Sequence, residues 1–117
     1  MAEYVVVGVD QIVAQDLADA IRVSDRTAEV VILRSEEEAL SVLVARRPAA
    51  VILHREPVGF HGSGLGRALA DFGTPHGFLS ALDEGGGAPI LVSPFTEATV
   101  QVFLERLKRF GPNAEPG

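Results

Sequence analysis

Short apolar runs alternate along the chain with segments in which apolar residues recur at helical spacing. The apolar runs predict strands over residues 4–9, 28–33, 49–53, 77–81 and 88–92. The helical spacing predicts helices over residues 11–23, 35–47, 65–72 and 97–107. Continuous apolar strands that alternate with helices are typical of a parallel sheet covered on both faces. We therefore expect an α/β domain.

Polar residues mark where the expected helices begin. Ser35 precedes Glu38 by three residues, which is the capping-box arrangement, and Thr96 and Ser63 are expected to cap the last helix and the third. In the second helix, Leu40, Leu43 and Val44 are expected to form the buried stripe. The acidic run 36–38 lies in the first turn of that helix, where negative charge is favourable, and needs no functional explanation.

Glycine is concentrated in one part of the chain. Nine of the twelve glycines fall between Gly59 and Gly87. Only six residues separate the expected strands 77–81 and 88–92, although a parallel connection usually needs about a dozen. The helix between these strands is therefore expected to be shortened or lost, with 82–84 forming at most one turn. The segment 59–66 matches no phosphate-loop pattern and is expected to be a flexible loop.

Composition excludes several classes of protein. Sixteen acidic and ten basic residues among 117 give a formal charge of −6, which is unfavourable for a nucleic-acid partner. Cysteine is absent, and no apolar run reaches the roughly 18 residues of a membrane span. No basic start of a signal peptide is visible. We expect one cytoplasmic domain over residues 1–111, a frayed tail over 112–117, and no cofactor.

The chain resembles the receiver domain of bacterial response regulators, in particular the compact single-domain receivers of alphaproteobacteria. The resemblance covers residues 4–110, and its most specific stretches are 16–21, 35–40, 47–53, 77–80 and 94–98. It implies a flavodoxin-like, three-layer α/β/α sandwich whose five-stranded parallel sheet has the order 2-1-3-4-5.

The resemblance also implies a phosphorylation site, and this chain lacks most of it. Such receivers use an aspartate nucleophile, two acidic magnesium ligands, a hydroxyl residue and a lysine before proline. These positions fall respectively on His54, on Gly8 and Val9, on Ser80, and on Ser93 before Pro94. Asp10 is the one carboxylate left near the first strand. The resemblance therefore implies a pseudo-receiver that is not an enzyme and binds no magnesium.

Two function classes follow. The first is a phosphorylation-independent protein-interaction module of two-component phosphorelay signalling, which docks a histidine kinase or another regulator, or forms a homodimer. The alternative is a small-anion or nucleotide-binding module that uses loop 59–66, His54, Ser80 and Ser93; an enzyme ranks third.

The Ser93–Pro94 bond is expected to be cis. The expected interface comprises loop 82–88 with Asp83 and Glu84, the strand edge at Ile90, and Gln101, Glu105 and Lys108 on the last helix.

The histidines suggest further chemistry. A phosphohistidine at His54 is disfavoured because the residue ends a strand; it is expected to fill the vacated pocket and to hydrogen-bond with Asp10 or Ser80. His54 and His61 are expected near the carboxyl edge of the sheet and His76 at the opposite edge, which excludes a three-histidine metal site. A two-histidine site formed by His54, His61 and an acidic residue stays open.

Overall fold

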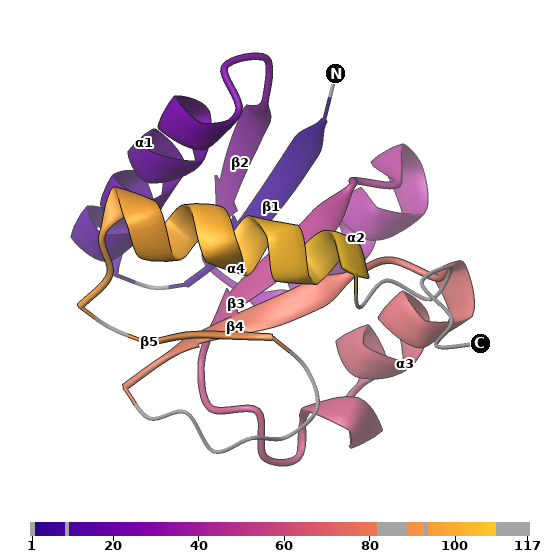
Figure 1. Cartoon of the computed structure of the whole chain (residues 1–117). Coiled ribbons are helices and arrows are strands. Elements are labelled where there is room, and N and C mark those ends of the chain that lie inside the picture. The colour runs from indigo at the N-terminus through magenta and orange to yellow at the C-terminus, as the bar shows by residue number, and fades with distance from the viewer. Residues whose placement is uncertain (1, 9, 82–88, 93, 110–117) are drawn as a thin grey trace.

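Five parallel strands form the centre of the molecule. The computed structural model describes residues 2–8, 10–81, 89–92 and 94–109. The strands pair in the order β2-β1-β3-β4-β5, which confirms the predicted topology (Figure 1). Their bounds are β1 Glu3–Val7, β2 Glu29–Leu33, β3 Ala50–His54, β4 His76–Ser80 and β5 Ile90–Val92.

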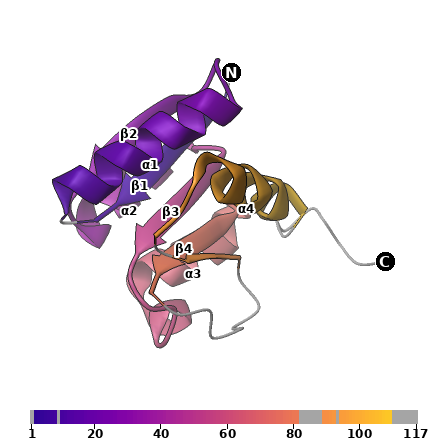
Figure 2. The same cartoon turned by 60° about the vertical axis from the view of Figure 1, so that its left-hand side comes forward.

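Helices cover both faces of the sheet, as the three-layer prediction requires. Helices α1 and α4 lie on one face and α2 and α3 on the other, as Figures 1 and 2 show from two directions. Successive residues of β1 and β3 alternate between the two cores, so that Val6 and Ile52 pack under α1 and α4 and Val5 and Val51 under α2 and α3. The bounds are α1 Gln11–Ser24, α2 Glu36–Arg46, α3 Gly64–Phe72 and α4 Glu97–Arg109.

The predicted helix caps are confirmed. The Ser35 hydroxyl accepts a hydrogen bond from the Glu38 backbone N–H, and Thr96 does the same for Thr99. The prediction for the buried stripe of α2 is wrong at Val44, whose exposed fraction is 59%. Val44 lies one residue beyond the buried Leu43, and one residue is about 100° of helix rotation.

The segment between β3 and α3 is packed, so the prediction of a flexible loop is wrong for it. It contains a short 3-10 turn, Phe60–Gly62, and Phe60 is fully buried against Phe78, with 5.2 Å between the ring centroids. Ser63 caps α3 as predicted, since its hydroxyl accepts from the Gly66 N–H at 3.1 Å and donates to the Phe60 carbonyl at 2.6 Å. The buried ring ties the turn to the sheet.

Between β4 and β5, the described residues form no helix, and the described part of the chain contains four α-helices in all. The predicted turn at 82–84, Asp83 and Glu84, the Ser93–Pro94 bond, Val9 and the tail 112–117 lie outside the described residues. The last strand, β5, has only three residues and follows Pro89 directly. No described helix is both long and apolar enough to cross a bilayer.

Candidate functional site

The ends of β1 and β3 bring Gly8 and His54 together at the carboxyl edge of the sheet. Val7 and Leu53 are register partners, so the residues that follow them lie side by side. A Cβ atom added to Gly8 would lie 3.0 Å from the His54 Cβ and 3.6 Å from its Nδ1. The close approach is thus made by the His54 Cβ, and the imidazole lies at ordinary van der Waals distance from where a side chain at position 8 would begin.

A cleft of about 190 Å³ opens beside this pair. Two arginines line it, and the Arg55 Nη1 donates to the Glu36 carboxylate at 2.8 Å. Arg34 is exposed and makes no side-chain hydrogen bond or ion pair with any described residue. Sequence reasoning did not select either arginine. The signal was available for Arg34, because it directly follows a predicted strand and must lie at this edge.

Asp10 caps a helix and does not bind the histidine. Its Oδ1 accepts hydrogen bonds from the Ile12 and Val13 N–H groups, both at 3.1 Å. His54 is exposed and makes no side-chain hydrogen bond with a described residue. The predicted bond from His54 to Asp10 or Ser80 is therefore wrong, since the Asp10 carboxylate is turned toward α1 and Ser80 is buried at the end of β4.

The predicted remnants are thus only partly brought together. Gly8 and His54 are in contact, while Asp10 faces its own helix. Val9 and Ser93 lie outside the described residues. Within residues 2–8, 10–81, 89–92 and 94–109, no group of three or more histidines, aspartates and glutamates could hold a metal ion. The roles assigned to these positions stay predictions.

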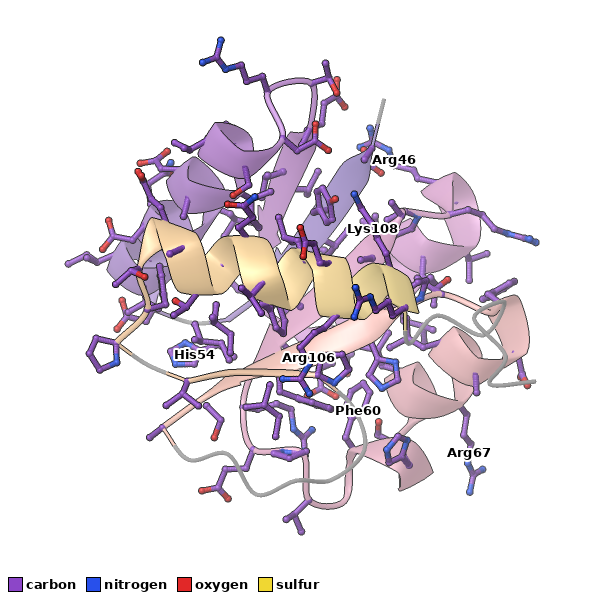
Figure 3. All side chains as sticks on the ribbon, viewed as in Figure 1. Arg46, His54, Phe60, Arg67, Arg106 and Lys108 are labelled. Carbon is purple, nitrogen blue, oxygen red and sulfur yellow. The ribbon has the colours of Figure 1, made fainter. Side chains whose placement is uncertain are left out.

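The histidines are distributed differently from the prediction. The rings of His61 and His76 lie 5.7 Å apart, so placing them at opposite edges was wrong. The turn that contains His61 folds back over the face of the sheet because Phe60 is buried there. His54 is distant from this pair: it pairs with Leu79, three residues and about 10 Å of strand beyond His76. In Figure 3, His54 and Phe60 are well separated.

His76 has an unusual environment. Its Nε2 atom is buried without a hydrogen-bond partner among the described residues. Burial lowers the pKa of His76, and the neighbouring His61 lowers this pKa further; a hydrogen bond with the Thr74 backbone acts in the opposite direction. His76 is therefore held neutral in the folded protein to a lower pH than in the unfolded chain.

This difference predicts a loss of stability on acidification. The unfolded chain takes up a proton at position 76 near pH 6.5, and the folded chain only at lower pH. The free energy of unfolding should thus fall as the pH drops through this window, by at most about 1.4 kcal/mol per pH unit, and His76 should add no slope above it. Urea unfolding from about pH 8 to about pH 5 measures the slope.

The control for this prediction is the exposed histidine at the other end of the sheet. His76→Gln should flatten the slope, whereas His54→Gln should leave it unchanged. Equal slopes in the wild-type protein and His76→Gln would contradict the assignment.

The predicted interface residues fall on two flanks of α4. Arg106 projects toward β5 and Lys108 away from it (Figure 3). Gln101, Glu105 and Lys108 border a hollow beside Tyr4 and Asp25 at the end of α1. The β5–α4 groove, of about 340 Å³, lies on the other flank and is lined by Ile90, Leu91, Val92, Ala98, Thr99, Val102, Phe103 and Arg106. Ile90 itself is buried, so the predicted patch is not one continuous surface.

The strand order and the alternation of helices are those of the flavodoxin-like fold, and solved receiver domains of response regulators share this fold with the chain. No model of a known protein family matches the sequence, and neither does any curated protein.

Three solved structures illustrate this likeness. SdrG from Sphingomonas melonis Fr1 has a TM-score of 0.74 and 23% identity, over 92% of this chain and 97% of SdrG. The chemotaxis response regulator CheY4 of Vibrio cholerae has a TM-score of 0.71 and 23% identity, over 92% of this chain and 98% of CheY4. The response regulator PhyR from Brucella abortus has a TM-score of 0.69 and 21% identity, over 91% of this chain and 47% of PhyR.

Proposed function

We propose that this chain is a phosphorylation-independent pseudo-receiver, a cytoplasmic signalling module of a two-component phosphorelay that acts by docking a protein. The observation that supports this most directly is the Gly8–His54 contact. In the family that the chain resembles, these positions supply a magnesium ligand and the phosphoryl acceptor. Here one has no side chain, and the other carries an imidazole that lies beside it.

The remaining carboxylate does not compensate for this loss. Asp10 accepts two backbone hydrogen bonds from the first turn of α1. Binding a cation with this oxygen would leave those N–H groups without their cap, at a cost of about 1 kcal/mol. Magnesium prefers oxygen ligands, and several together. The edge described here offers the Asp10 carboxylate, one oxygen of which already caps α1, and Glu36, which is paired with Arg55.

The docking surface that we propose is the β5–α4 groove. Its walls are largely apolar, and Val92 and Val102 at its rim are 40% and 56% exposed. Apolar residues gathered beside a hollow favour contact with another protein. A second copy of the chain is the simplest occupant, followed by a helix of a histidine kinase. Glu105 and Lys108 lie on the other flank of α4. Reversing both charges is a separate prediction, and it should weaken self-association or partner binding.

We expect Val102→Asp to weaken self-association by roughly tenfold or more, because a charge would replace an apolar contact worth about 1–2 kcal/mol. Sedimentation velocity over a concentration series measures the dimer dissociation constant. Val44→Asp is the matched control, because Val44 is exposed to a similar degree, 59% against 56%, but belongs to α2 on the opposite face.

The same series decides the outcome. The proposed surface is wrong if Val102→Asp associates as the wild-type protein does, or if Val44→Asp weakens association equally. A wild-type protein that stays monomeric at all concentrations excludes the homodimer as the occupant.

A second function, binding of a small anion, is favoured by one observation. Arg34, Arg55 and His54 line the same cleft beside Gly8. From the sequence, loop 59–66 is also expected to contribute to this site. In the structure, Phe60 of this loop packs against Phe78 and His76 instead. Native mass spectrometry of protein purified from cells tests this alternative: a retained anion that is lost in Arg34→Ala would favour it over docking alone.

A further inference from the structure

The buried Nε2 atom of His76 has no hydrogen-bond partner in the part of the chain that the structure describes. Burial removes this nitrogen from water, and no described group replaces the lost hydrogen bond. Buried polar side-chain atoms are almost always paired, and a lone exception calls for a ligand, an ion or a water. The pseudo-receiver site does not use His76, which lies about 10 Å of strand away from His54.

The surroundings of this atom suit a metal ligand. An Nε2 atom without a hydrogen bond can offer its lone pair to a metal when the ring proton is on Nδ1. The Thr74 backbone lies next to the ring, and because the Thr74 N–H already donates to the Leu69 carbonyl, the Thr74 carbonyl is the backbone group left to face Nδ1. Metal-bound histidines usually donate through their second nitrogen to a carbonyl or carboxylate in this way.

A second imidazole lies at a suitable distance. The ring centroids of His61 and His76 are 5.7 Å apart. Two imidazoles that bind one zinc ion tetrahedrally, through bonds of about 2.0–2.1 Å, have their centroids about 5.2 Å apart. The difference is small, and His61 is exposed on a three-residue turn, where its ring can rotate without disturbing the core.

We infer that His61 and His76 together form a binding site for a late divalent transition metal ion such as Zn²⁺, held through the Nε2 atom of His76 and one ring nitrogen of His61. Imidazole ligands suit zinc, copper and nickel, whereas magnesium and calcium prefer oxygen. The described residues add no third protein ligand, and the remaining coordination positions would be open to water. The site is separate from the edge at which the family binds magnesium.

The test uses the untagged full chain, freed of metal with a chelator and titrated with ZnCl₂ near neutral pH. Calorimetry should show saturable binding of one ion per chain. His61→Asn should weaken it at least tenfold, and this variant should fold because position 61 is exposed. His54→Asn is the matched control and should bind as the wild-type protein does. In ¹⁵N spectra, zinc should move the His76 Nε2 resonance away from the position of a free lone pair, and Mg²⁺ should not.

Three results would each overturn the inference. The wild-type protein could show no saturable zinc binding, His61→Asn could bind as tightly as the wild type, or His54→Asn could lose binding. The NMR arm avoids substituting the half-buried His76, so a folding defect cannot mimic the expected result. None of these outcomes depends on whether the pseudo-receiver docks a protein.

Discussion

Replacing Gly66 by alanine should lower the free energy of unfolding by about 3 kcal/mol or more. A Cβ at this position would lie 2.2 Å from the Phe60 carbonyl oxygen and 3.1 Å from the His61 Cα, both backbone atoms. The turn cannot move away easily, because Phe60 is buried against Phe78 and its carbonyl accepts from Ser63. Urea unfolding followed by circular dichroism measures the loss, which corresponds to a melting temperature lower by roughly 10 °C.

Gly64 provides the matched control two residues earlier in α3. A Cβ on Gly64 would meet no atom within 4 Å. Gly64→Ala should therefore be neutral or stabilising by up to about 1 kcal/mol, because alanine restricts the unfolded chain and favours the helix. If Gly66→Ala were as stable as Gly64→Ala, the close packing of α3 on the 60–62 turn would be incorrect.

The phosphoryl chemistry should be absent, and one substitution should not restore it. In ¹⁵N spectra, the wild-type protein should show no saturable, magnesium-dependent shifts with beryllofluoride, and acetyl phosphate should add no mass. His54→Asp should give the same result, although it supplies the missing nucleophile. Gly8 and Val9 still cannot hold magnesium, and Ser93 supplies no cation to the transition state, where such groups contribute large rate factors.

The fourfold variant Gly8→Asp, Val9→Asp, His54→Asp and Ser93→Lys is the positive control, and it should respond to beryllofluoride. A Cβ at residue 8 would lie 3.0 Å from the Cβ of residue 54, which histidine and aspartate both carry, so Gly8→Asp alone and the fourfold variant should both be less stable than the wild-type protein. Saturable, magnesium-dependent shifts around residue 54 in the wild-type protein, or phosphorylation of His54→Asp, would contradict the proposed function.

The sequence predicts the strands and helices well because the signals involved are local, whereas the order of the sheet follows from the family resemblance. Each strand is a short apolar run, and helix starts such as Ser35 and Thr96 are set by hydrogen bonds within one turn. The contact of Gly8 with His54 follows from parallel topology, since both residues directly follow paired strand positions. No long-range information beyond the family resemblance is needed for these features.

The segment 55–63 could not be predicted in the same way. Its path depends on Phe60 packing against Phe78, a contact between residues that no periodicity connects. The same contact brings His61 to His76 and removes the turn from the cleft at the carboxyl edge. Likewise, Arg106 and Lys108 lie about 200° apart around α4, but which of the two sides borders β5 depends on how the helix packs on the sheet.

The shortness of β5 limits how a partner can bind beside it. An edge strand can extend its sheet by accepting a strand from another protein, through a ladder of backbone hydrogen bonds. Here the edge is three residues long, about 10 Å, and proline at positions 89 and 94 provides no N–H to continue the ladder on either side. Strand addition would therefore gain few hydrogen bonds. Recognition at this face should therefore rely on side chains that enter the β5–α4 groove, which favours a partner helix over an extended peptide. The short strand also disfavours edge-to-edge aggregation through β5.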